Sequence, residues 1–220
     1  MPDIVLFDLD GTLTDAAPGI VNSLKYALDD MGIEHPDDET IRTFLGPPLD
    51  ITFREYFGLT AEQSRAGIAK YRERYHDVGE LENAVYPGIP EVLQQLTEAG
   101  AILAVSTSKP TVSATRILEH FALAQYFAFI GGAALDTSRD SKALVIAHTL
   151  EELAEQGVNV PAAAKTMVGD REHDVLGAAQ FDIPTIGVLW GYGSRAELDA
   201  AGAIRLVETP DNLIRALRVR

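Results

Sequence analysis

Short apolar runs of strand length alternate with helical patterns over most of this chain. The runs lie at Ile4–Phe7, Ile102–Val105, Phe127–Ile130, Thr166–Val168, Thr185–Leu189 and, more weakly, near Leu206. Runs that are apolar throughout are typical of parallel strands buried on both faces. Between them, apolar residues recur at helical spacing, as in Ile146, Leu150 and Leu153 ahead of the helix-ending Gly157. This pattern predicts an α/β fold, a Rossmann-like parallel sheet with helices on both faces.

The region after the first strand breaks this rhythm, because its helical patterns have no strand between them. It begins with an amphipathic pattern and continues into a long polar stretch, residues 60–78, which predicts a solvent-facing helix. We therefore expect an all-helical cap inserted after the first strand. The expected domains are an α/β hydrolase core of residues 1–16 and 85–220 and a helical cap of residues 17–84.

Charge and composition restrict the classes of partner. The formal net charge of -15 argues against a nucleic acid polymer and against an anionic membrane, since both bind basic surfaces. The sequence contains no cysteine, which excludes disulfides, zinc–thiolate sites and a cysteine nucleophile. We find neither an apolar run long enough to cross a bilayer nor a secretory signal, so we expect a cytoplasmic protein.

Polar side chains gather at the ends of the predicted strands. Asp8 and Asp10 follow the first strand, "STSK" (106–109) follows the second, and "GDREHD" supplies Asp170 and Asp174 after a later one. Ligands of open parallel sheets bind beyond the carboxyl ends of the strands. An edge that carries carboxylates, hydroxyls and a lysine can bind a divalent metal ion and a phosphate together.

The segments "DLDGTLTD", "STSK", a later lysine and "GDREHD" resemble the four motifs of the haloacid dehalogenase superfamily. The chain looks most like the phosphatases of that superfamily with a helical cap after the first strand, namely phosphoglycolate phosphatase and related bacterial 5'-nucleotidases. "GDREHDVLGA" and "IGVLWGYGS" are the stretches most similar to that group. The resemblance implies a Mg²⁺-dependent phosphomonoester hydrolase whose partner is a small phosphorylated metabolite, such as phosphoglycolate or a nucleoside 5'-monophosphate.

The resemblance also implies roles for the carboxylates. Asp8 would be the nucleophile that forms an aspartyl-phosphate. Asp10 would protonate the leaving alcohol and then deprotonate the water that hydrolyses the intermediate. The protein ligands of Mg²⁺ would be the Asp8 carboxylate, the Asp10 backbone carbonyl and the Asp170 carboxylate. Asp174 would orient metal-bound water or the lysine from just outside these ligands.

Substrate binding would fall to a hydroxyl motif and a lysine. By resemblance, Thr107 and the Ser108 backbone would bind the phosphoryl oxygens, and Lys142 would balance their charge. Lys109 competes with Lys142 for this role because it is nearer to Thr107, but Lys142 starts a helix before "GDREHD", as the motif lysine of the family does. Thr107 and Ser108 could instead cap the helix that begins near Pro110.

The sequence departs from the family pattern at two places. Many relatives carry asparagine where Ser108 stands. Many also carry glycine shortly after the "GDREHD" helix, where this chain has "QFDIP" with Phe181. Without glycine, a left-handed helix end is less easy there.

Other reactions share this chemistry. A sugar phosphomutase would use Asp8 and Asp10 in the same way but return the phosphoryl group to its substrate. A phospho-receiver signalling domain also holds aspartates and Mg²⁺ at strand ends, but it lacks a helical insert and a general acid two residues further on. The cap would act as a lid that contacts the leaving group, with "FLGPPL" (44–49) at its mouth.

Overall fold

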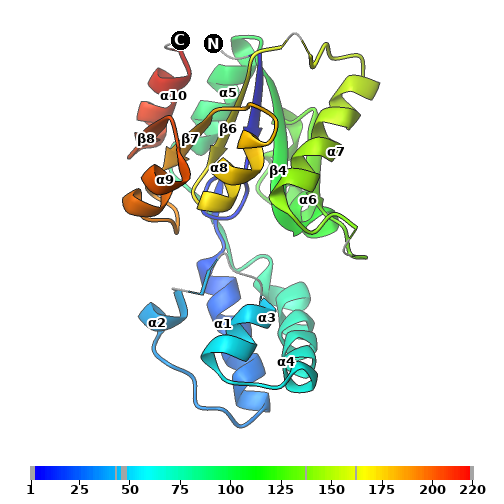
Figure 1. Cartoon of the computed structure of the whole chain (residues 1–220), viewed down its shortest axis with the longest axis vertical. Helices are drawn as coiled ribbons and strands as arrows, with labels where there is room; N and C mark the ends of the chain where they lie inside the picture. Colours follow the sequence, from blue (N-terminus) through cyan, green and yellow to red (C-terminus); the bar gives the residue numbers. More distant parts are fainter. Residues whose placement is uncertain (1–2, 43, 46–48, 137, 162, 219–220) are drawn as a thin grey trace. The chain divides into compact units, whose positions relative to one another are not determined.

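The computed structural model describes residues 3–42, 44–45, 49–136, 138–161 and 163–218, and the chain divides into two compact units (Figure 1). The first is an α/β unit formed by Met1–Asp15 and Val85–Arg220, and the second is a helical unit formed by Ala16–Ala84. The chain passes between them at two short strands, β2 (Thr14–Asp15) and β3 (Ala84–Val85). No helix in the described part of the chain is long and apolar enough to span a membrane.

A six-stranded sheet forms the centre of the α/β unit. Its strand order is β5-β4-β1-β6-β7-β8, and every neighbouring pair is parallel. The strands are β1 (Ile4–Phe7), β4 (Ile102–Pro110), β5 (Phe129–Ala133), β6 (Lys165–Gly169), β7 (Thr185–Val188) and β8 (Arg205–Val207). The predicted parallel α/β sheet is therefore confirmed, with the first strand at its centre.

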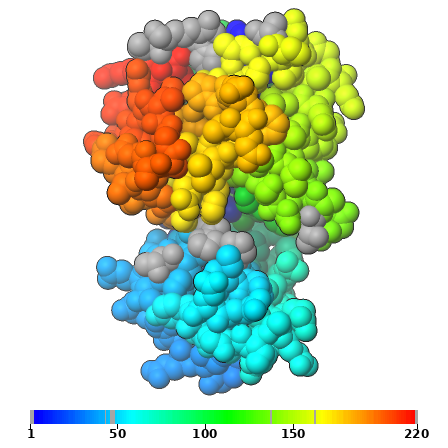
Figure 2. All heavy atoms as spheres, in the orientation of Figure 1, coloured from blue at the N-terminus to red at the C-terminus, as the bar shows by residue number. Residues whose placement is uncertain are grey.

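Helices cover both faces of this sheet, which explains why β1 is apolar throughout. Val5 and Phe7 face one hydrophobic cluster, and Ile4 and Leu6 face another, because side chains alternate along a strand. The first cluster is completed by α5 (Ile89–Glu98), α6 (Thr111–His120) and α10 (Pro210–Arg218), and the second by α7 (Lys142–Glu155) and α8 (Glu172–Ala179). Helix α9 (Arg195–Ala201) lies beside α8, as the neighbouring orange and yellow surfaces in Figure 2 show.

Four strands have boundaries that differ from the prediction, and β6 is longer than the expected 166–168 by one residue at each end. The run expected at 127–130 lies at Phe129–Ala133, and the run expected at 185–189 ends at Val188. The largest difference is in β4, which continues past Val105 to Pro110. Its polar end stays in the sheet because Ser106 and Thr107 pair with two glycines of β5. Backbone pairing does not require apolar side chains, so the hydrophobic pattern located only the buried part of this strand.

The end of α8 also differs from expectation. The helix stops at Ala179, and the chain turns back through Asp182, whose φ is 55°. Aspartate tolerates the left-handed region better than most non-glycine residues. Asp182, the residue after Phe181, therefore adopts the left-handed conformation that a glycine would otherwise provide.

The helical unit is built on the packing of α1 against α4. Its elements are α1 (Ala17–Asp30), α2 (Asp38–Arg42), α3 (Leu49–Ile51), the π-helix η1 (Thr52–Tyr56), α4 (Ala61–Arg74) and the π-helix η2 (Tyr75–Gly79). Leu24, Leu28 and Phe53 lie fully buried in its core. The described part of this unit has no long strand, as the sequence pattern indicated.

The predicted exposed helix at 60–78 is wrong in two respects. Helix α4 ends at Arg74 and continues as a π-helix, and Tyr71 and Tyr75 are both only 6% exposed. The two rings stack with centroids 5.3 Å apart. Two tyrosines supply a large apolar contact area despite their polar neighbours, so the low mean hydropathy of the stretch concealed a buried face.

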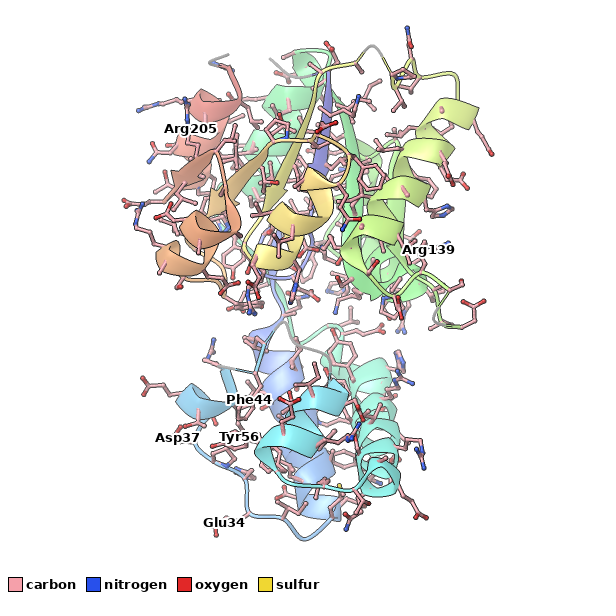
Figure 3. All side chains as sticks on the ribbon, in the orientation of Figure 1. Glu34, Asp37, Phe44, Tyr56, Arg139 and Arg205 are labelled. Carbon is pink, nitrogen blue, oxygen red and sulfur yellow. The ribbon has the colours of Figure 1, made fainter. Side chains whose placement is uncertain are left out.

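The segment "FLGPPL" is described only in part, because residues 46–48 lie outside the described residues. Phe44 contacts the ring of Tyr56 with centroids 4.4 Å apart (Figure 3). Leu45 is buried in the helical unit. The expected place of this segment at the mouth of a cap stays a prediction.

Candidate active site

The candidate site begins where β1 ends. Phe7, the last residue of β1, pairs with Val105 of β4 and Val168 of β6. Asp8 follows, and its backbone N–H donates to the carbonyl of Val168 at 2.9 Å, which fixes the start of the loop. Asp170 comes directly after β6. The carboxyl ends of the central strands therefore bring Asp8 and Asp170 to one edge, where the strand order also changes direction.

A tight turn folds the segment after Asp8 against Asp170. The Leu9 carbonyl accepts backbone hydrogen bonds from Thr12, Leu13 and Thr14. Gly11 has a φ of +81°, and a Cβ atom at this position would lie 2.2 Å from Oδ2 of Asp170. Only glycine satisfies both the positive φ and the close approach. The "DGT" part of the motif is therefore needed to close the turn onto Asp170.

Three carboxylates meet beneath this turn. One oxygen each of Asp8, Asp170 and Asp174 lies within 4.8 Å of the other two, and all three residues are buried. Burial raises the pKa of the Asp174 carboxyl to about 6, although Lys142 opposes the shift. Burial, followed by the charges of Asp174 and Asp8, also raises the pKa of Asp170 well above its ordinary value. Both shifts show that burial disfavours the ionised forms of these carboxylates.

Lys142 is the cation of this cluster. Its ammonium lies 2.9 Å from Oδ1 of Asp8 and 2.8 Å from Oδ1 of Asp174, and it donates to the carbonyl of Ser106 at 3.0 Å. Burial alone would lower the pKa of Lys142, but the two carboxylates reverse that effect and raise it, so the lysine stays charged. One positive charge then faces three carboxylates, which favours a bound cation.

Lys109 occupies a different place from Lys142. Its ammonium lies 2.8 Å from Oδ2 of Asp10, and its side chain is nearly buried. Burial raises the pKa of Asp10, whereas Lys109 opposes the shift. The other oxygen of Asp10, Oδ1, is buried and has no hydrogen-bond partner among the described residues. That oxygen remains available to exchange a proton with a ligand.

The hydroxyl motif lies within β4 rather than after it. Thr107 is buried, and its Oγ1 accepts a hydrogen bond from the backbone N–H of Lys109 at 3.2 Å. Ser108 is exposed. The N-cap of α6 is Pro110, with no side-chain capping hydrogen bond, so the alternative that Thr107 or Ser108 caps this helix is wrong.

Compared with the predicted ligand set, the structure places one aspartate differently. Asp174 was expected just outside the metal ligands, but its carboxylate joins the cluster of Asp8 and Asp170. The Asp10 carboxylate faces Lys109 instead, which is consistent with the expectation that only its backbone carbonyl serves a metal ion. The predicted roles of all these residues remain proposals.

Two contacts of Asp170 were not anticipated. Thr12 donates from Oγ1 to Asp170 Oδ1 at 3.2 Å, and the backbone N–H of Tyr192 donates to Asp170 Oδ2 at 2.8 Å. Sequence analysis singled out "IGVLWGYGS" as a family-like stretch without giving it a role. Its paired glycines were the only available signal of a close backbone approach.

Comparisons with known proteins identify the family of this chain. A model of the haloacid dehalogenase-like hydrolases matches residues 5–188, a span that contains every predicted site residue. The chain belongs to the haloacid dehalogenase-like hydrolase family, as predicted from its motifs.

Individual relatives carry different names. A 5'-nucleotidase of Pseudomonas aeruginosa is 42% identical over 89% of this chain and 86% of its own length. A crystal structure described as a predicted phosphatase from Clostridium acetobutylicum is 42% identical, with a TM-score of 0.89 over 99% of this chain and 98% of its own. Tyrosine-protein kinase PtkA of Mycobacterium tuberculosis is also 42% identical, over 99% of this chain and 73% of its own length. Similarity of this degree to all three does not select one substrate.

Proposed function

We propose that this hydrolase is a Mg²⁺-dependent phosphatase that acts on phosphate monoesters of small metabolites through an aspartyl-phosphate on Asp8. The observation that carries the proposal is the buried cluster of Asp8, Asp170 and Asp174 with Lys142 between two of its members. Buried carboxylates destabilise a protein unless a cation compensates their charge, so the cluster favours a bound cation.

The residues present fit a divalent metal ion. Carboxylate oxygens are the ligands that Mg²⁺ prefers, and three of them converge here beside Lys142. Asp8, Asp170 and the backbone carbonyl of Asp10 would hold the ion, with Asp174 beside them. When bound, Mg²⁺ supplies charge stabilisation for the phosphoryl oxygens.

The first half-reaction uses both motif aspartates. Leu9 N–H and Lys142 both contact Oδ1 of Asp8, at 2.8 and 2.9 Å, which leaves Oδ2 to attack phosphorus. A bond forms between this oxygen and phosphorus as the bond to the ester oxygen breaks. Asp10 gives its proton to that oxygen, so the product leaves as an alcohol. Burial, which raises the pKa of Asp10, favours the protonated form that this step needs.

The second half-reaction returns the enzyme to its starting state. Asp10, now ionised, takes a proton from water, and the water oxygen attacks the aspartyl-phosphate. The phosphorus–Asp8 bond breaks, and inorganic phosphate is released. Throughout, Lys142 and Thr107 would contact the phosphoryl oxygens, with Lys142 fixed by the Ser106 carbonyl.

The competing functions differ in the molecule that accepts the phosphoryl group. A phosphatase transfers it to water, a sugar phosphomutase to a sugar hydroxyl, and a tyrosine kinase to a phenol. The similarity to PtkA makes the third acceptor a second candidate. For the hydrolase, phosphoglycolate and nucleoside 5'-monophosphates are the substrates that we favour.

A balance of products tests the proposal. Purified protein is incubated with each member of a phosphate-ester panel, with Mg²⁺ or with EDTA, and substrate loss and inorganic phosphate are both measured. We expect one phosphate for each ester consumed, and only with Mg²⁺. A parallel reaction contains ATP and a tyrosine peptide. Isomerised substrate without phosphate would favour the mutase, and phosphotyrosine formation would favour the kinase.

A further inference from the structure

Residues 190–193, the segment after β7, contact Asp170. This segment has no role in the proposed reaction. The backbone N–H of Tyr192 donates to Oδ2 of Asp170 at 2.8 Å. The Thr12 hydroxyl donates to the opposite oxygen, Oδ1, at 3.2 Å. The carboxylate is therefore oriented from two sides, by two segments that are far apart in the sequence. One donor on each oxygen holds the carboxyl group of Asp170 in a single orientation.

The backbone approaches Asp170 too closely for any side chain. A Cβ atom at Gly191 would lie 2.4 Å from Cβ of Asp170 and 2.3 Å from the carbonyl oxygen of Gly11. A Cβ atom at Gly193 would lie 1.9 Å from the carbonyl oxygen of Asp170. Both glycines are thus required by close packing rather than by an unusual φ. The segment is shaped to fit this one aspartate.

Two side chains hold the segment in place. The Trp190 indole donates from Nε1 to the carbonyl of Thr12 at 3.1 Å. The Tyr192 hydroxyl donates to Oδ1 of Asp15 at 3.1 Å. Asp15 is the last residue of the α/β unit before the chain enters the helical unit.

We propose that Tyr192 is a positioning residue for the metal ligand Asp170: its hydroxyl, anchored on Asp15, keeps its own backbone N–H on the Asp170 carboxylate. The inference rests on the proposed Mg²⁺-dependent function. Partners that orient a ligating carboxylate contribute about 10–100-fold to metal affinity in other proteins. Because Tyr192 acts through its backbone, loss of the anchor should weaken this hydrogen bond without removing it.

The direct test is Tyr192→Phe, which removes only the anchoring hydroxyl. Isothermal titration with Mg²⁺ should show affinity weaker by about tenfold, at the low end of such effects. The kcat at saturating Mg²⁺ should stay within about twofold of wild type, since the reacting groups are unchanged. A purely structural tyrosine would instead lower Tm and leave the Mg²⁺ Kd unchanged. Tyr126→Phe, at a tyrosine that packs against the core cluster of the same unit, is the matched control.

A second pair of variants tests the route through Asp15. Asp15→Asn keeps an acceptor at Oδ1 and should bind Mg²⁺ about as tightly as wild type. Asp15→Ala removes it, and adding Tyr192→Phe to that variant should weaken Mg²⁺ binding no further. Asp15 makes other contacts too, so the double-mutant cycle, rather than the single variant, isolates the coupling. Independent effects of the two changes would overturn the inference.

Measurements on the wild-type protein distinguish failure of the positioning role from failure of the proposed function. If wild type binds no Mg²⁺ and keeps full activity in EDTA, the proposed function and the positioning role both fall. If wild type needs Mg²⁺ and Tyr192→Phe binds it equally well, only the positioning role is wrong.

Discussion

The ammonium of Lys142, at the first position of α7, lies 2.9 Å from Oδ1 of Asp8, the residue that follows β1. Lys142 also contacts Asp174 at 2.8 Å, so it balances two carboxylates at once. The same arrangement that lowers the repulsion between these carboxylates places a cation where phosphoryl oxygens would gather. Stability of the site and its proposed chemistry therefore depend on the same contacts.

Replacing Asp8 with asparagine should abolish turnover and leave the fold intact. The amide has lost the charge and nucleophilicity needed to attack phosphorus. Removing one of three clustered carboxylates should also raise the Tm of the metal-free protein. Hydrolysis assays and thermal unfolding in EDTA check both effects, with Asp199→Asn at an exposed site as the control. Activity close to that of wild type would refute the assignment of Asp8 as the nucleophile.

Replacing Lys142 and Lys109 separately should give different defects. Lys142→Met should abolish activity that added Mg²⁺ does not restore, because the lysine would touch the phosphoryl group rather than chiefly the metal. Lys109→Met should be less damaging. It removes the charge that opposes the raised pKa of Asp10, so the Asp10 limb of the pH–rate profile should move to higher pH. A dead Lys109 variant beside an active Lys142 variant would show that the two roles are reversed.

Replacing Asp10 with asparagine should affect substrates unequally. An alkyl phosphate needs its leaving oxygen protonated, so its hydrolysis should slow by about 10²–10⁴-fold. Para-nitrophenyl phosphate has a better leaving group and should lose less in the first step. Because water then lacks its base, the aspartyl-phosphate should accumulate and appear by intact mass after an acid quench. Equal losses on both substrates with no adduct would leave Asp10 with a structural role only.

Much of the fold could be predicted because β1 is buried on both faces and leaves an unbroken apolar signal. Asp8 and Asp170 were placed together by one topological rule, that the ends of parallel strands share an edge. The polar end of β4 escaped prediction because Ser106 and Thr107 stay in the sheet through backbone pairing with glycines. The buried faces of Tyr71 and Tyr75 escaped it because polar residues surround them.

The parts of the site that sequence reasoning missed are contacts between distant segments. The pairing of Lys109 with Asp10 depends on where β4 ends, which the hydrophobic pattern misplaced. The contact of Tyr192 with Asp170 is made by a backbone N–H. Every residue except proline has this group, so the sequence does not indicate such a contact. The glycines on either side of Tyr192 were the only sequence signal that this segment approaches Asp170 closely.

The buried carboxylates should make the metal-free protein less stable as pH rises toward neutrality. Burial raises the pKa of Asp174 from 3.8 to about 6, so between these values the native state binds more protons than the unfolded state. Stability then falls with increasing pH across this interval, and the full cost is present above it. The raised pKa of Asp170 acts in the same direction. In EDTA, Tm should therefore be higher at about pH 5.5 than at about pH 7.5, with roughly 2–4 °C for each kcal/mol.

Added Mg²⁺ should reverse this trend, because a bound cation replaces the proton as the compensating charge. The Tm increase caused by Mg²⁺ should be larger at about pH 7.5 than at about pH 5.5, since protons compete for the same oxygens at the lower pH. Thermal unfolding of wild type and Asp174→Asn, each with Mg²⁺ or EDTA, isolates this group from the general effect of the net charge of -15. The variant should have a flatter pH dependence in EDTA than wild type. If the two slopes are equal, the ionisation of Asp174 does not govern the pH dependence of the stability of the metal-free protein.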